Sequence, residues 1–232
     1  MKKSLAQPLQ LHKNSSDLIV GKNFLRKIDI VLARRIFVAA LATLLASCAA
    51  PRDTEHHIVV SVRDQKLALL QKEKLVALYP VSTSKFGLSD RPGSYGTPLG
   101  ELEIADKIGD GAPPGTVFKD RRRTGEVVTV NAPGRDPIVT RIIWLRGRQG
   151  QNANAFQRDI YIHGTPEERN IGRPASYGCI RMRSVDIVNL YSQVGPGAQV
   201  SIITTPLTAV IPELGPKATQ MAESNHALGV IR

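Results

Sequence analysis

The sequence predicts a mainly β domain, a sandwich or barrel of strands with one or two helices packed on it. Two observations support this class. From residue 57 onward, short apolar and β-branched runs recur with only a few polar residues between them, whereas a helical pattern is clear only after residue 183. The 232 residues, 42% of them hydrophobic, suffice for one domain with a sizeable core plus extensions.

The early strands are separated by short polar turns, which favours antiparallel hairpins. We expect strands at residues 58–62, 66–70, 75–82, 100–104, 126–130, 138–145, 160–163 and 199–204. The helix begins after Ser184, a residue suited to cap it, and ends at the Gly-Pro-Gly of residues 195–197. Four apolar residues share one face of this helix: Ile187, Leu190, Tyr191 and Val194.

Two longer loops interrupt the strands. Residues 84–100 are rich in Gly, Ser and Pro, and either they simply connect two strands or, with Tyr95 and Thr97, they form one wall of a cleft. Residues 109–124 contain the basic run 119–123, which reads KDRRR. We expect a solvated loop here, with attraction to an anionic polymer or to lipid headgroups as the alternative.

The N-terminal segment is not part of the predicted core. Arg34 and Arg35 precede an apolar stretch at residues 36–45, which is too short to cross a bilayer comfortably and is typical of a signal peptide. The residues Leu-Ala-Ser before Cys48 resemble a bacterial lipobox, in which the cysteine thiol becomes lipidated. We therefore expect a membrane-anchored lipoprotein of the cell envelope that faces the periplasm, with an ordinary signal peptide or a weak anchor helix as the alternative.

The net charge argues against a nucleic-acid partner once this leader is removed. The whole chain carries +11, but residues 48–232 hold 23 basic and 18 acidic residues and so carry only +5. Most of the basic excess that would indicate nucleic-acid binding therefore lies in the leader.

The residues with chemical potential lie between positions 163 and 182, which read HGTPEERNIGRPASYGCIRM. A strand over residues 160–163 should place His163 at its end, with Gly164 allowing a turn. An imidazole near Cys179 would generate the thiolate that makes cysteine nucleophilic. The N–H groups of Gly178 and Cys179 are expected to form an oxyanion hole. The alternative is a buried, inert cysteine beside a core histidine.

A zinc site is not indicated by this pair. Structural zinc sites take four ligands and catalytic sites three, and no third ligand for His163 and Cys179 is evident. We therefore expect neither a metal nor an organic cofactor.

Residues 176–181, which read SYGCIR, resemble the motif of the L,D-transpeptidase catalytic domain (YkuD type). The family motif is a histidine, a spacer of this length, then Ser/Thr-His-Gly-Cys, an apolar residue and often Arg. Residues 96–102, which read GTPLGEL, are similar to a second family segment. The resemblance covers roughly residues 57–204 and implies that His163 deprotonates Cys179.

The chain departs from the motif at Tyr177, which replaces a histidine thought to assist substrate or oxyanion binding. A phenol, with a reference pKa of about 10, can donate a hydrogen bond but cannot act as an imidazolium. We also expect Ser176, Gly164 and Arg181 at the oxyanion or substrate, Arg181 because it follows Cys179 by two residues in an extended segment and so faces the same side. Arg181 either lowers the thiol pKa, holds a substrate carboxylate, or forms a structural salt bridge.

The resemblance implies a function and a set of domain boundaries. The function is acyl transfer on peptidoglycan stem peptides, forming L,D cross-links through a thioester. Two alternatives are an L,D-carboxypeptidase or hydrolase of the same bond, and a peptidoglycan-binding module whose catalysis is weakened by Tyr177. The expected parts of the chain are an N-terminal extension with signal peptide (1–47), a linker (48–56), the catalytic domain (57–204) and a mobile C-terminal tail (205–232).

Overall fold

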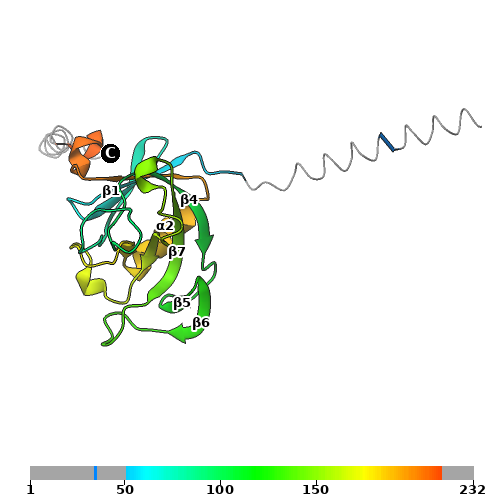
Figure 1. Cartoon of the computed structure of the whole chain (residues 1–232), viewed down its shortest axis with the longest axis vertical. Helices are drawn as coiled ribbons and strands as arrows, with labels where there is room; N and C mark the ends of the chain where they lie inside the picture. The colour runs from blue at the N-terminus through cyan, green and yellow to red at the C-terminus, as the bar shows by residue number, and fades with distance from the viewer. Residues whose placement is uncertain (1–33, 36–50, 216–232) are drawn as a thin grey trace, which may run out of the picture. The chain divides into compact units, whose positions relative to one another are not determined.

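A computed structural model describes residues 34–35 and 51–215 of the chain (Figure 1). The predicted lipidation site Cys48, nearly all of the predicted signal peptide and residues 216–232 lie outside the described residues. Within the described ranges, no helix is long and apolar enough to cross a membrane.

The described residues confirm the mainly β class, with a helix packed against the strands. One 10-stranded mixed sheet has the order β3-β2-β1-β10-β4-β7-β5-β6, and β8 and β9 branch from β7. The strands are β1 (His56–Ser61), β2 (Lys66–Gln71), β3 (Lys74–Pro80), β4 (Gly100–Ile108), β5 (Thr116–Lys119), β6 (Arg122–Val127), β7 (Ile138–Gly147), β8 (Tyr161–Gly164), β9 (Ile180–Met182) and β10 (Gln199–Ile203). The helix α2 spans Ser184–Gln193, and four short 3-10 helices are η1 (Gly150–Asn152), η2 (Glu168–Asn170), η3 (Leu207–Ala209) and η4 (Pro212–Leu214).

The register of the strands follows from their apolar patterns. Strands β1, β2 and β3 form the expected antiparallel hairpins, and β10 returns to pair parallel with β1. A second parallel pair, β8 with β9, aligns Ile162 with Ile180 and His163 with Arg181. Because β9 is reached through a crossover from β8, two segments far apart in sequence lie side by side at the branch.

Helix α2 helps to close the main core. It packs against β7 and β8, and its residues Ile187 and Leu190 are fully buried in the main core. Figure 1 shows α2 beside β7. On β8 and β9, the side chains of Ile162, Ile180 and Met182 enter the same core. Since side chains alternate along a strand, the neighbouring residues of β8 and β9 face the opposite side of the sheet.

The start of the helix differs in one detail from the prediction. Arg183 occupies the cap position, and Ser184 is the first helical residue. The N–H of Ser184 donates to the Glu168 carboxylate (2.7 Å), so a side chain sixteen residues away satisfies one of the free N–H groups of the first helical turn.

The expected loop at residues 109–124 instead contains β5 and the start of β6, which form a hairpin. The turn is made by Asp120 and Arg121, which both have positive φ. Arg121 places its guanidinium 4.4 Å from the Trp144 ring centroid and donates to Asp159 (2.8 Å), so part of the basic run is structural.

The C-terminal part of the domain extends further than expected. Residues 205–215 were assigned to a mobile tail, but η3 and η4 place Leu207 and Ile211 in a small buried cluster with Val59, Ala68 and Leu70 of β1 and β2. The N–H of Leu207 also donates to Asp64 (2.7 Å). Residues 205–215 therefore pack against the sheet through these contacts, and the mobility of the expected C-terminal tail stays a prediction.

Candidate active site

His163 and Cys179 lie on the same face of the β8–β9 pair. In the parallel register His163 is opposite Arg181, so Cys179, two residues before Arg181, is its diagonal neighbour. His163 is 5% exposed, and Cys179 is partly buried. The chain thus brings the predicted pair together from segments sixteen residues apart in sequence.

The thiol of Cys179 is held between two backbone groups of the segment that leads into β8. The Sγ–H donates to the carbonyl of Asp159 (3.3 Å), and the N–H of Tyr161 donates to Sγ (3.4 Å). The thiol therefore rests against the β8 backbone rather than in a hydrogen bond to His163.

The imidazole of His163 is oriented by its own strand. Nδ1 lies 2.8 Å from the carbonyl oxygen of Gly164. Because a carbonyl only accepts, Nδ1 carries the hydrogen, and in the neutral ring Nε2 is unprotonated and able to accept a proton. The tautomer is thus the one that a general base requires.

Burial keeps this pair uncharged at neutral pH. It lowers the pKa of His163 to about 4 and raises the pKa of Cys179 to about 11. The Tyr161 N–H and the Arg181 charge lower the thiol pKa, but they do not offset the effect of burial. The resting form is therefore thiol and neutral imidazole, and the thiolate forms only as the thiol reacts.

This charge state predicts a steep pH dependence of Cys179 alkylation by iodoacetamide. Since only the thiolate reacts, the rate constant should rise about tenfold per pH unit from pH 7 to pH 10. Peptide mass spectrometry of the full-length chain at each pH separates Cys179 from Cys48. A rate that is constant above pH 6 would instead indicate a stable thiolate–imidazolium pair and contradict the expectation.

The loop that carries Cys179 is held by its own polar groups. Ser176 Oγ donates to the carbonyl of Cys179 (2.6 Å), and the N–H of Gly178 donates to Ser176 Oγ (3.2 Å). Thr97 Oγ1 donates to the carbonyl of Gly178 (2.9 Å). Gly178 has φ +120°, and a Cβ there would lie 3.2 Å from the carbonyl oxygen of Gly96, so this position requires glycine.

These bonds change the predicted oxyanion hole. The Gly178 N–H is already bonded within the loop, whereas the Cys179 N–H has no side-chain or loop-backbone partner within residues 51–215. Gly164, also expected near the substrate, serves as the acceptor for His163, and a Cβ at Gly164 would come within 2.6 Å of the Val139 carbonyl oxygen. Close packing against β7 therefore accounts for this second glycine.

Arg181 forms a salt bridge whose partner the sequence did not reveal. Its guanidinium lies 2.6 Å from Asp136, and Asp136 also accepts a hydrogen bond from Thr165 Oγ1 (2.6 Å). Arg181 is only 8% exposed. Of the three roles considered for Arg181, this geometry favours the structural salt bridge. The positive charge of Arg181 also lowers the pKa of the Cys179 thiol.

A cavity of about 270 Å³ contains Cys179. Its other lining residues include Tyr95, Arg158, Ile160 and Tyr177. Tyr177 is 55% exposed, and its hydroxyl accepts a hydrogen bond from Lys85 Nζ (3.0 Å), which lowers the pKa of the phenol. The motif position that departs from the family therefore lies at the cavity, with its hydroxyl engaged by a lysine.

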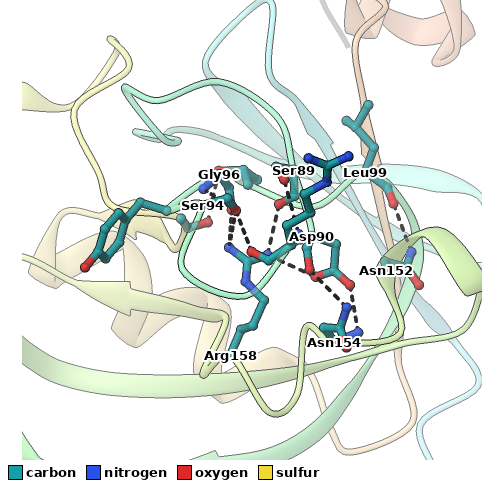
Figure 2. A network of polar contacts seen from close by, with 12 residues as sticks. Ser89, Asp90, Ser94, Gly96, Leu99, Asn152, Asn154 and Arg158 are labelled. Atoms are coloured by element: carbon teal, nitrogen blue, oxygen red, sulfur yellow. Dashed lines mark hydrogen bonds and ion pairs between the residues drawn. The ribbon is translucent and has the colours of Figure 1, made fainter.

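The loop at residues 84–100 forms one wall of this cavity, the second of its two expected roles. Arg158 holds the loop by donating to the carbonyls of Ser89 (2.9 Å) and Gly96 (2.8 Å) and to the Asp90 carboxylate (3.0 Å). Asp90 in turn accepts from the N–H of Asn154 (2.7 Å). Figure 2 shows these groups pointing toward one another between the loop and residues 154–158.

A larger cavity of about 420 Å³ contains neither Cys179 nor His163. It is lined by polar residues near β1, β4 and β10, including His56, His57, Glu101 and Glu103. His56 pairs with Asp53 (2.9 Å), and His57 lies 2.7 Å from Ser201 Oγ. Within the described ranges, no three or more His, Cys, Asp or Glu residues are grouped to hold a metal ion.

Comparison with known proteins gives a consistent family. The L,D-transpeptidase catalytic domain (YkuD) matches residues 55–202. The chain is 30% identical over 179 residues to the probable L,D-transpeptidase YcfS of Escherichia coli, covering 75% of this chain but 51% of that protein. It is 28% identical over 153 residues to the putative L,D-transpeptidase YqjB of Bacillus subtilis, covering 66% of this chain and 73% of that protein.

Solved structures also align with the chain. An L,D-transpeptidase from Mycobacterium smegmatis matches with a TM-score of 0.41 and 18% identity, covering 64% of this chain and 58% of the other.

Proposed function

Because the chain belongs to the L,D-transpeptidase catalytic domain family, we propose that it is a cysteine acyltransferase that forms L,D cross-links between peptidoglycan stem peptides. The observation that carries this proposal is the placement of Cys179 in a cavity, with His163 beside it on the paired strand in the tautomer of a general base. Both residues and their pairing lie inside the matched segment.

The first half of the reaction is acylation of Cys179. The thiol passes its proton to Nε2 of His163 as Sγ attacks the carbonyl carbon of the amide before the terminal D-residue. The N–H of Cys179 stabilises the oxyanion that forms. The C–N bond then breaks, the imidazolium returns its proton to the leaving amine, and a thioester remains on Cys179.

The second half resolves the thioester. An amine of a second stem peptide gives up a proton to His163 and attacks the thioester carbonyl, which releases the thiol and leaves an amide cross-link. Water in place of the amine gives the L,D-carboxypeptidase product. The chemistry at Cys179 is the same in both cases, so the acceptor decides between cross-linking and hydrolysis.

We also propose that the protein acts in the cell envelope, anchored by lipid at Cys48 and facing the periplasm. The support is the apolar stretch at residues 36–45 followed by Leu-Ala-Ser-Cys. Lipidation of Cys48 would leave Cys179, the other cysteine of the chain, without a partner for an intramolecular disulfide in the oxidising exported compartment, so Cys179 would stay a free thiol.

Product analysis tests the proposed function. The full-length chain is incubated with tetrapeptide muropeptides, and the products are identified by their masses in mass spectrometry. We expect loss of the terminal residue together with a dimer mass, and neither product from protein already alkylated at Cys179. Tripeptide without dimer would favour the hydrolase. Untouched substrate with no acyl adduct on Cys179 would favour a binding module weakened at Tyr177.

A further inference from the structure

Three large aromatic side chains lie exposed together beside the Cys179 cavity. Phe86, Tyr95 and Tyr177 are 52%, 56% and 55% exposed. Their ring centroids are 5.4 to 5.9 Å apart in all three pairings. Two of them, Tyr95 and Tyr177, line the cavity itself. Aromatic rings gathered at the surface next to a reactive thiol indicate a surface for binding.

Lys85 brings a positive charge to this surface. Its Nζ donates to the Tyr177 hydroxyl (3.0 Å) and lies 4.3 Å from the centroid of the Tyr177 ring and 5.2 Å from that of Phe86. These contacts hold the Lys85 ammonium in place but do not neutralise its positive charge. Two of its three N–H donors remain for a ligand, since an ammonium has three and Tyr177 takes one.

The other cations near the thiol already have carboxylate partners. Arg158 is paired with Asp90 (3.0 Å) and Arg181 with Asp136 (2.6 Å). Lys85 forms no ion pair with any carboxylate of the part of the chain that the structure describes. Lys85 therefore brings an uncompensated positive charge to the Tyr177 side of the cavity, and the complementary ligand group is an anion.

The backbone of Lys85 is tied to the loop that carries the nucleophile. Its N–H donates to the carbonyl of Ser176 (3.1 Å), next to a bridge between Ser84 and Ser176. Ser84 Oγ also donates to the carbonyl of Tyr95 (2.6 Å). Lys85 is thus attached to a residue three positions before Cys179, and its position relative to the thiol is fixed rather than set by a free loop.

We propose that Lys85, held by Tyr177 and Phe86, binds a carboxylate that flanks the scissile amide of the stem peptide and so determines which peptides are recognised. This inference rests on the proposed function. Such a carboxylate has two sources, the free α-carboxylate of the terminal residue and a side-chain carboxylate of the residue before it. A charge-assisted hydrogen bond to either one would orient the amide toward Cys179.

Binding without turnover tests this proposal. The full-length Cys179→Ala protein is titrated with three tetrapeptides: the free acid, its terminal carboxamide, and the amide of the preceding side chain. We expect one amidation to raise Kd about five- to tenfold at low salt, with a smaller effect at high salt because the pair is exposed. The amide that weakens binding identifies the carboxylate.

Lysine variants in the same background assign the effect. Lys85→Gln should bind the acid and both amides equally, whereas Lys85→Arg should keep the preference for the acid. As a control, Lys119→Gln changes an exposed lysine of the β5–β6 hairpin and should leave this preference unchanged. The proposal is overturned if the ratio of Kd values for the amide and the acid stays the same in Lys85→Gln. It is also overturned if the Cys179→Ala protein with Lys85 intact binds the acid and both amides equally, or binds none of them. The proposed function is tested separately by product formation, so the two can fail independently.

Discussion

Replacing Cys179 by alanine is expected to lower kcat for release of the terminal residue by at least about 10⁴-fold, because the proposed acyl intermediate forms on the Cys179 thiol. His163 would remain in place, with Nδ1 still bonded to Gly164, but would have no thiol to deprotonate. The rate of D-residue release, followed by chromatography, checks this expectation.

The fold of the variant serves as the control for this experiment. Cys179 is only partly buried and packs at the edge of a small cluster with Tyr161 and Trp144, so loss of its sulfur should cost about 1 kcal/mol of unfolding free energy. Unchanged circular dichroism with lost turnover is the expected combination. If Cys179→Ala keeps more than a few per cent of the wild-type kcat, the nucleophile lies elsewhere and the proposed function is wrong as stated.

The strands were the part of the fold that local sequence could predict, and His163 and Cys179 were the candidate site residues that it singled out. Apolar runs such as residues 58–62 and 66–70 are close to β1 and β2, because burial of both faces of these strands leaves a short continuous apolar run in the sequence. His163 and Cys179 were found because each lies beside small residues whose backbone roles are local. The structure brings the two together on paired strands, and their chemical roles remain a prediction.

The β5–β6 hairpin was missed because its sequence lacks the usual turn residues. Two-residue turns with positive φ favour Asn-Gly or Gly-Gly, whereas here the positions are Asp120 and Arg121. Strand β6 is exposed along its whole length, so it has no apolar alternation. Strand β6 forms because it pairs with β5. Residue propensities and apolar periodicity describe single segments, so they do not indicate such a pairing.

The polar partners around the site were missed for a different reason. Arg181 and Asp136 are 45 residues apart, and Lys85 and Tyr177 are 92 apart. Nothing near Arg181 in the sequence indicates which carboxylate it meets, so the salt-bridge role could be named as an option but its partner could not. Such pairs depend on the order in which β4, β7, β8 and β9 are assembled.

Arg158→Met is expected to destabilise the wall of the thiol cavity by about 3–5 kcal/mol, the usual effect of removing one partner of a buried ion pair. Arg158 and Asp90 have side chains only 9% and 6% exposed, so Asp90 would be left buried without its cation. The carbonyls of Ser89 and Gly96 would also lose their donor (Figure 2). Denaturant unfolding measures the global loss, and hydrogen exchange detects opening confined to residues 84–100.

A matched control and a second variant separate this ion pair from a general effect of charge. Arg91 is exposed on the same loop and makes no ion pair within residues 51–215, so Arg91→Met should change stability by less than about 0.5 kcal/mol. Adding Asp90→Asn to Arg158→Met removes the unpaired charge and should recover part of the loss. A single-variant loss below 1 kcal/mol would mean that water reaches Asp90. The loop would then be an independent connection rather than a wall that positions Tyr95 beside Cys179.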